Sequence, residues 1–204
     1  LNGMDIKEPD VTTQQEHTVQ DINDIDITKI QISDPQNKKT TYDGTSKIWT
    51  STTLKYQNRQ LEFMLQNDED QDSRPMSAPF GISTEKNLAT LNIPDSIVNK
   101  LTTFESKVIY PWIFQHRNSL GPPTSNIRNE QDVRHVYKSM IRKNRSYNNI
   151  YLKVPTNPSG DIADEFYICN TDTQENITDS IIRGRVKFQV DAICIREVKL
   201  SCPD

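Results

Sequence analysis

Two adjacent runs of β-forming residues between Ser46 and Gln66 constrain the fold more than any other part of the sequence. The first run, Ser46 to Tyr56, is rich in threonine and aromatic side chains, which favour strands. Gln57 to Gln60 is a polar loop of four residues, and Leu61 to Gln66 is strand-forming again. The pattern predicts a β-hairpin at this place.

The order of the remaining elements predicts the fold class. Further strands are expected within Ile25 to Ile32, Leu88 to Ile93, Ile150 to Val154, Glu165 to Cys169 and Arg185 to Leu200. Between them, Pro35 to Thr41 is expected to be a polar turn. The sequence therefore predicts a mainly β, α+β domain. Its expected form is an OB-like five-stranded antiparallel barrel with helices between strands 3 and 4.

The helical insert is expected around residues 95–145. Apolar residues from Ile97 to Val108 recur every three or four positions, which indicates one buried face of an amphipathic helix. Pro111 is expected to stop or kink this helix. A second helix is expected from Glu130 to Lys143.

Charge divides the chain into an acidic beginning and a basic centre. Residues 1–24 are predicted to be an acidic, mobile arm, and residues 25–204 to be the OB-like domain. The net charge of the whole chain is -4, yet between Ser96 and Pro155 ten lysines and arginines face three carboxylates. An acidic total therefore does not exclude an anionic partner, and the arm is expected to shield the basic centre when that partner is absent.

A basic stretch with interspersed tyrosines lies inside this centre, from Val133 to Pro155. Its candidate DNA-binding residues are Arg142, Lys143, Arg145, Tyr147, Tyr151 and Lys153. Cations that contact phosphates and rings that stack on bases are typical of a groove for single-stranded nucleic acid. The alternative is a solvated helix end followed by an ordinary strand.

Two further groups of candidates lie outside that stretch. The first consists of Lys47, Trp49, Lys55 and Arg59, on the first strand of the hairpin and at its turn. The second consists of Arg183, Arg185 and Lys187, before the last strands. A tryptophan flanked by lysines on an exposed strand face is suited to base stacking. The alternative for Trp49 is a place inside the barrel or under the helix.

No pattern in the sequence indicates an enzyme, a cofactor or a metal site. Asp68, Asp70 and Asp72 have the spacing of a calcium loop, but the glycine and glutamate that such a loop needs are missing. Three cysteines without C-x-x-C spacing indicate reduced thiols in an intracellular compartment. No apolar run is long enough to cross a membrane, so no membrane partner is expected.

Several short motifs resemble a known family. Met76-Ser-Ala-Pro-Phe-Gly-Ile-Ser83 resembles the Met-x-x-Pro-Phe-Gly-Val-Ser segment of single-stranded DNA-binding proteins of nucleocytoplasmic large DNA viruses, distant relatives of podophage single-stranded DNA-binding proteins. Tyr147 to Pro155 and the Ile-Ile-Arg-Gly-Arg-Val-Lys run that starts at Ile181 resemble later motifs of this family. Two features differ. Cys194-Ile-Arg stands where the family carries a tryptophan, and the acidic residues lie near the start of the chain rather than in a C-terminal tail.

The resemblance implies a non-catalytic viral protein that binds single-stranded DNA in replication, recombination or repair. Its expected partners are single-stranded DNA or RNA, replication proteins and further copies of itself, and its expected location is the host cytoplasm or nucleus. A second hypothesis belongs to a different class. In this hypothesis the chain is a structural or scaffolding protein of the virion, and aromatic side chains on the same barrel bind capsid proteins.

Overall fold

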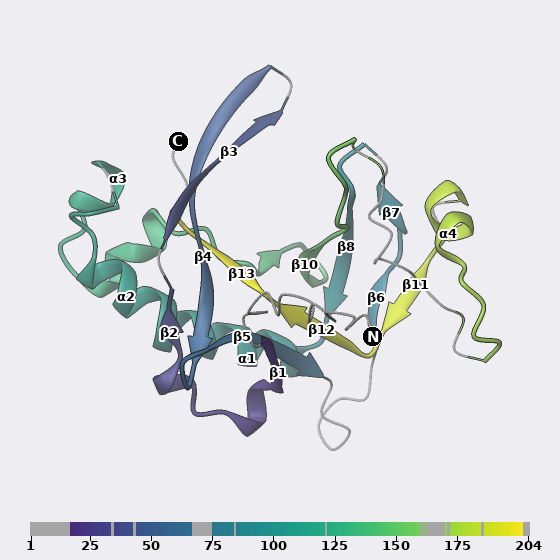
Figure 1. The fold of residues 1–204 in the computed structure, drawn as a ribbon, viewed down its shortest axis with the longest axis horizontal. Coiled ribbons are helices and arrows are strands. Elements are labelled where there is room, and N and C mark those ends of the chain that lie inside the picture. Colours follow the sequence, from purple (N-terminus) through teal and green to yellow (C-terminus); the bar gives the residue numbers. More distant parts are fainter. Residues whose placement is uncertain are drawn as a thin grey trace, which may run out of the picture.

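The computed structural model describes residues 17–33, 35–42, 44–66, 75–83, 85–120, 122–159, 161, 170, 172–184 and 186–201. Within these residues the chain is mainly β, with a helical insert, and its strands form two sheets (Figure 1). The α+β class predicted from the sequence is therefore confirmed. The described strands do not close into a single barrel.

The first sheet is organised around the long strand β4 (Thr45–Tyr56). β4 forms a projecting hairpin with β3 (Gln36–Tyr42), and it pairs at its other end with β2 (Gln31–Ile32) and β5 (Arg59–Gln66) (Figure 1). β5 also pairs in parallel with β1 (His17–Asp21). The chain turns from β4 into β5 at Gln57 and Asn58, whose φ values of 51° and 62° are left-handed. Such a two-residue turn follows the natural twist of a hairpin, so Arg59 and Gln60 belong to the strand and not to the expected loop of four residues.

The second sheet has the order β11-β6-β8-β10-β9, with β7 paired to β8. Its strands are β6 (Met76–Ala78), β7 (Ile82–Ser83), β8 (Leu88–Ile93), β9 (Arg142–Lys143), β10 (Asn148–Lys153) and β11 (Phe188–Val190). Along β8, residues alternate between buried and half-buried, as expected when one sheet face covers a core.

The last described stretch of chain joins the two sheets. β11 pairs with β6 in the second sheet, whereas β12 (Ala192–Ile195) pairs with β5 and β13 (Glu197–Ser201) pairs with β4 in the first. The sequence predicted one final strand or a pair of strands here. The structure has three, because the chain changes partners at Asp191 and again at Arg196.

The helical insert covers the core. α1 (Asp95–Phe104), a π-helical turn (Glu105–Ile109) and α2 (Tyr110–Gln115) follow one another without a break. The ring of Phe104 lies 4.6 Å from that of Phe63 on β5, measured between centroids, and both side chains are fully buried. Burial of such large apolar side chains is the main stabilising contribution to a fold of this kind.

Pro111 does not stop this helix, so the first of the two predicted alternatives, a stop or a kink, is wrong. Proline lacks an N–H group, and its ring collides with a carbonyl of the preceding turn in an ordinary helix. Here the π-helical turn directly before Tyr110 widens the helix and shifts those carbonyls, which lets the helix continue to Gln115.

The second predicted helix is much shorter than expected. Only Glu130–His135 is helical, as a 3-10 helix, and residues 142–143 form β9 instead. β9 pairs with β10 through Arg142 opposite Asn149 and Lys143 opposite Asn148. These cross-strand hydrogen bonds hold the backbone extended where the sequence pattern alone predicted a helix.

Other differences lie near the N-terminal side of the domain. The polar segment predicted as a turn at Pro35 to Thr41 forms most of β3, which pairs with β4 along its length. The isoleucines between Ile25 and Ile32 do not form one strand, because a 3-10 turn at Ile27–Lys29 separates them. Residues 17–24, assigned to the arm, form β1 and a short 3-10 helix with Ile22 buried. The rest of the arm and the expected strand from Glu165 to Cys169 lie outside the described residues.

Candidate nucleic-acid interface

Trp49 lies on the solvent-facing side of β4. Thr50, Thr52 and Leu54 are buried on one side of that strand, and Trp49 and Ser51 lie on the other side, where the Ser51 side chain is buried as well. The tryptophan is half-buried, and the Nζ atom of Lys199 on β13 lies 4.2 Å from its ring centroid. An ammonium group over an indole face is a favourable cation–π contact. Of the two interpretations of Trp49, the structure therefore supports a side chain on the outer face of the sheet.

A carboxylate lies among the cations of this face. Glu197 Oε1 accepts hydrogen bonds from Lys38 Nζ on β3, at 2.5 Å, and from Ser51 Oγ. Partial burial by itself raises the pKa of Glu197, but the hydrogen bonds from Lys38 and Ser51 outweigh it and hold that pKa below its ordinary value. Glu197 is therefore a charged acceptor at neutral pH.

The outer face of the second sheet has a matching aromatic–cation pair. Ile150 on β10 is buried in the core, so Tyr151 and Lys153 point to the opposite side. The tyrosine is 50 % exposed, and the guanidinium carbon of Arg142 on β9 lies 4.2 Å from its ring centroid. Both sheets thus present an aromatic ring with a cation on one of its faces.

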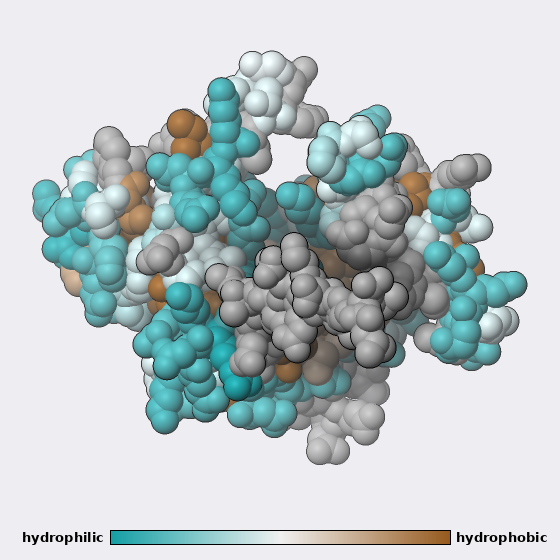
Figure 2. All heavy atoms as spheres, viewed as in Figure 1, coloured by the Kyte–Doolittle hydropathy of each residue, from teal (hydrophilic) through white to brown (hydrophobic). Residues whose placement is uncertain are grey.

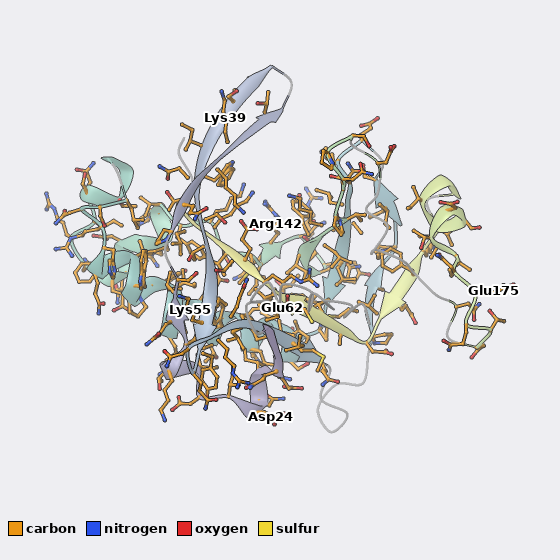
Figure 3. All side chains as sticks on the ribbon, in the orientation of Figure 1. Asp24, Lys39, Lys55, Glu62, Arg142 and Glu175 are labelled. Atoms are coloured by element: carbon orange, nitrogen blue, oxygen red, sulfur yellow. The ribbon has the colours of Figure 1, made fainter. Side chains whose placement is uncertain are left out.

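The two outer faces adjoin one another. After the hydrogen bonds and the charge of Lys38, the charge of Lys153 on β10 also helps to lower the pKa of Glu197 on β13. Arg142 lies between the β3–β4 hairpin and β8 (Figure 3). We call the set of Lys38, Trp49, Arg142, Tyr151, Lys153 and Lys199 the basic–aromatic face. Figure 2 shows an opening, bordered mainly by hydrophilic residues, between the projecting hairpin and the second sheet.

Four of the predicted site residues belong to this face: Trp49, Arg142, Tyr151 and Lys153. Arg145 and Tyr147 are exposed in the turn that joins β9 to β10, next to the face. Lys143 is exposed as well, but it alternates with Arg142 and so points to the other side of β9.

The remaining predicted site residues are not brought to this face or are not described. Lys55 is six residues from Trp49 along β4, which corresponds to about 20 Å of extended chain, and Arg59 lies beyond the turn that follows. Lys187 precedes β11, three strands away from β10, or about 14 Å across the sheet. The side chains of Lys47 and Arg183, and all of Arg185, lie outside the described residues.

Sequence reasoning missed two cations of the face, Lys38 and Lys199. Lys38 was overlooked because its segment was interpreted as a turn, whereas it lies directly opposite Trp49 in the pairing of β3 with β4. Lys199 had a local signal, because it stands between Val198 and Leu200, both of which are buried. Its strand partner on β4 lies almost 150 residues away, at Ser51, and no local pattern indicates that pairing.

A buried carboxyl supports the strand that carries Arg142. Glu105, in the π-helical turn, is only 4 % exposed and accepts a hydrogen bond of 2.6 Å from Ser139 Oγ. The Ser139 hydroxyl oxygen in turn accepts one from the backbone N–H of Ile141, the residue before Arg142. Removal from water raises the pKa of Glu105, and it also raises that of its neighbour Tyr137. This network holds the chain in place where it enters β9.

Two other kinds of site are absent from the described part of the chain. The residues placed there include no group of three or more histidine, cysteine or acidic side chains that could hold a metal ion. They also include no helix that is long and apolar enough to cross a membrane. Comparison of the chain with protein-family models, with curated proteins and with solved structures gives no match.

Proposed function

We propose that this chain is a non-catalytic protein that binds single-stranded nucleic acid on the basic–aromatic face. The observation that carries the proposal is the pair of cation-covered rings, Trp49 with Lys199 and Tyr151 with Arg142, on adjoining outer faces of two sheets. Stacking on such rings tolerates any base, and cations beside them neutralise the phosphates.

The proposed mechanism has two contributions. Lys38, Arg142, Lys153 and Lys199 attract the phosphate backbone, which makes affinity fall as salt rises. Bases that are unpaired then stack on Trp49 and Tyr151, which a duplex with its bases inside cannot do. The face therefore favours single strands and has little sequence preference.

We further propose an OB-like relation between the strands and a role in viral DNA replication, recombination or repair. Strands on both sides of a helical insert support the first part, and the motifs at Met76 to Ser83 and Tyr147 to Pro155 support the second. Replication proteins and further copies of the chain would then be its protein partners. The two sheets would correspond to the halves of an opened barrel.

The test is a titration of labelled oligothymidylate with the full chain at low and at physiological salt, followed by fluorescence anisotropy. We expect binding that weakens as salt rises and weakens again in Trp49→Ala. A duplex of the same length serves as the control and should bind more weakly. Equal affinity for duplex and single strand would contradict stacking, and no binding at low salt would overturn the proposal.

A second candidate function, a structural role in the virion, is favoured by apolar side chains on the surface. Phe80, in the turn after β6, is 77 % exposed, and Ile48 and Val19 are more than half exposed. Exposed aromatic and aliphatic side chains are typical anchors of protein contacts. A Phe80→Ser variant separates the two functions, because it should weaken assembly with capsid proteins or with itself and leave oligonucleotide binding unchanged.

A further inference from the structure

Glu197 is in an unusual place for an acidic residue. It lies on the basic–aromatic face, where one of its oxygens accepts hydrogen bonds from both Lys38 and Ser51 and where the charge of Lys153 also reaches it. An ammonium and a hydroxyl that converge on one anionic oxygen are also the donors that proteins use for phosphate oxygens.

The ion pair of this carboxylate with Lys38 is expected to add little to fold stability. The side chains of Lys38 and Glu197 are 55 % and 44 % exposed, and an ion pair with that exposure contributes little to the free energy of unfolding. Its electrostatic effect on an incoming polyanion is larger, because it neutralises one lysine and repels phosphates from the centre of the face.

We propose that Glu197 occupies, in the free protein, the position of a phosphodiester oxygen of the bound strand. This inference rests on the proposed function and adds a specific subsite to it. On binding, a phosphate takes over the hydrogen bonds from Lys38 and Ser51, and the Glu197 side chain moves away into water. The exchange limits affinity, and it excludes weakly held anions that cannot displace the carboxylate.

The experiment compares Glu197→Gln with the matched control Glu175→Gln. Both substitutions remove one negative charge, but Glu175 is exposed in a loop at the edge of the molecule, away from the centrally placed Arg142 (Figure 3). Binding of labelled oligothymidylate is measured by anisotropy over a range of salt concentrations. We expect Glu197→Gln to bind at least about fivefold more tightly than the control at low salt. Its plot of log affinity against log salt should be steeper by about 0.7, the contribution of one further phosphate contact on a single strand.

A second comparison, made in a Lys38→Ala background, separates the release of Lys38 from any change in folding. In this background Glu197→Gln should give a clearly smaller gain, because the lysine that it releases is gone, and thermal unfolding of each variant confirms the native state. If the wild-type chain binds but Glu197→Gln matches Glu175→Gln, the subsite is wrong while the proposed function stands. If no variant binds at any salt, both are wrong.

Discussion

Trp49 and Tyr151 have the same kind of partner but different surroundings. Each ring has a cation 4.2 Å from its centre. Trp49, however, pairs with Lys38 of β3, has Lys199 of β13 over its ring, and is half-buried. Tyr151 is half exposed, and its cation comes from β9, an edge strand of two residues.

The two aromatic–cation pairs have similar chemistry, but their side chains are held with different rigidity. A side chain already fixed by two neighbouring strands loses little freedom when a base stacks on it, whereas an exposed side chain at a sheet edge loses more. We therefore expect the Trp49 side to provide most of the binding free energy and the Tyr151 side to provide reach along the strand.

The largest effect is expected for Trp49→Ala. Loss of one base–aromatic stack should weaken oligothymidylate binding by about 1–3 kcal/mol, or roughly 5- to 150-fold. Trp49→Phe is the control, because it keeps a ring on the strand and should retain most of the affinity. Anisotropy titrations at one salt concentration measure all three proteins.

Tyr151→Ala should have a smaller effect than Trp49→Ala, about threefold to tenfold on the same dissociation constant. Arg142→Ala should resemble it, since the guanidinium covers this ring and, in the proposed complex, would contact phosphate. If Tyr151→Ala weakens binding as much as Trp49→Ala does, the two sides are equivalent and the proposed difference in rigidity is wrong.

Glu105 offers a pH-dependent test of the support behind Arg142. Burial raises its pKa above the ordinary value of 4.5, so the folded state prefers the protonated carboxyl. Its contribution to the free energy of unfolding is then complete below about pH 4.5 and is lost as the pH rises through the raised pKa.

Glu105→Gln, which stays neutral, should remove that part of the pH dependence. At neutral pH it should stabilise the fold by about 1 kcal/mol, because a buried charge no longer has to be accommodated. Urea unfolding from acidic to neutral pH measures the effect, with Glu130→Gln, an exposed residue, as the control. If the free energy of unfolding depends on pH in the same way in the wild-type chain and in Glu105→Gln, then Glu105 does not ionise inside the fold.

Deletion of residues 1–16 should tighten binding modestly, by a few fold at low salt and not at high salt, because those residues carry four carboxylates and one lysine. The deletion must end there, since the next residues form β1 and pair with β5. Unchanged affinity at low salt would mean that the acidic arm does not shield the basic–aromatic face.

The smallest effect is expected for Lys55→Ala and Lys187→Ala. Both cations were sequence candidates, but each lies well away from the pair of rings, so each substitution should change the dissociation constant by less than twofold. A loss comparable to that of Arg142→Ala would extend the binding surface beyond the face defined here.

Elements whose signals are local can be predicted from the amino-acid sequence alone. The alternating residues of β8, the threonine-rich β4 and the apolar stripe of α1 are all visible in the sequence, as is a strand at Ile150 to Val154, close to the bounds of β10. Strand propensity and periodicity depend on neighbouring residues, so a single sequence records them.

Which strands pair and which side chains meet depends instead on contacts between distant parts of the chain. β3 is a strand because it hydrogen bonds to β4, and residues 142–143 are extended because β10 lies beside them. Lys199 reaches Trp49 because β13 returns to β4 from the far end of the chain. Such contacts gain their free energy from partners distant in sequence, so the short segments that form them carry no local sign of the pairing.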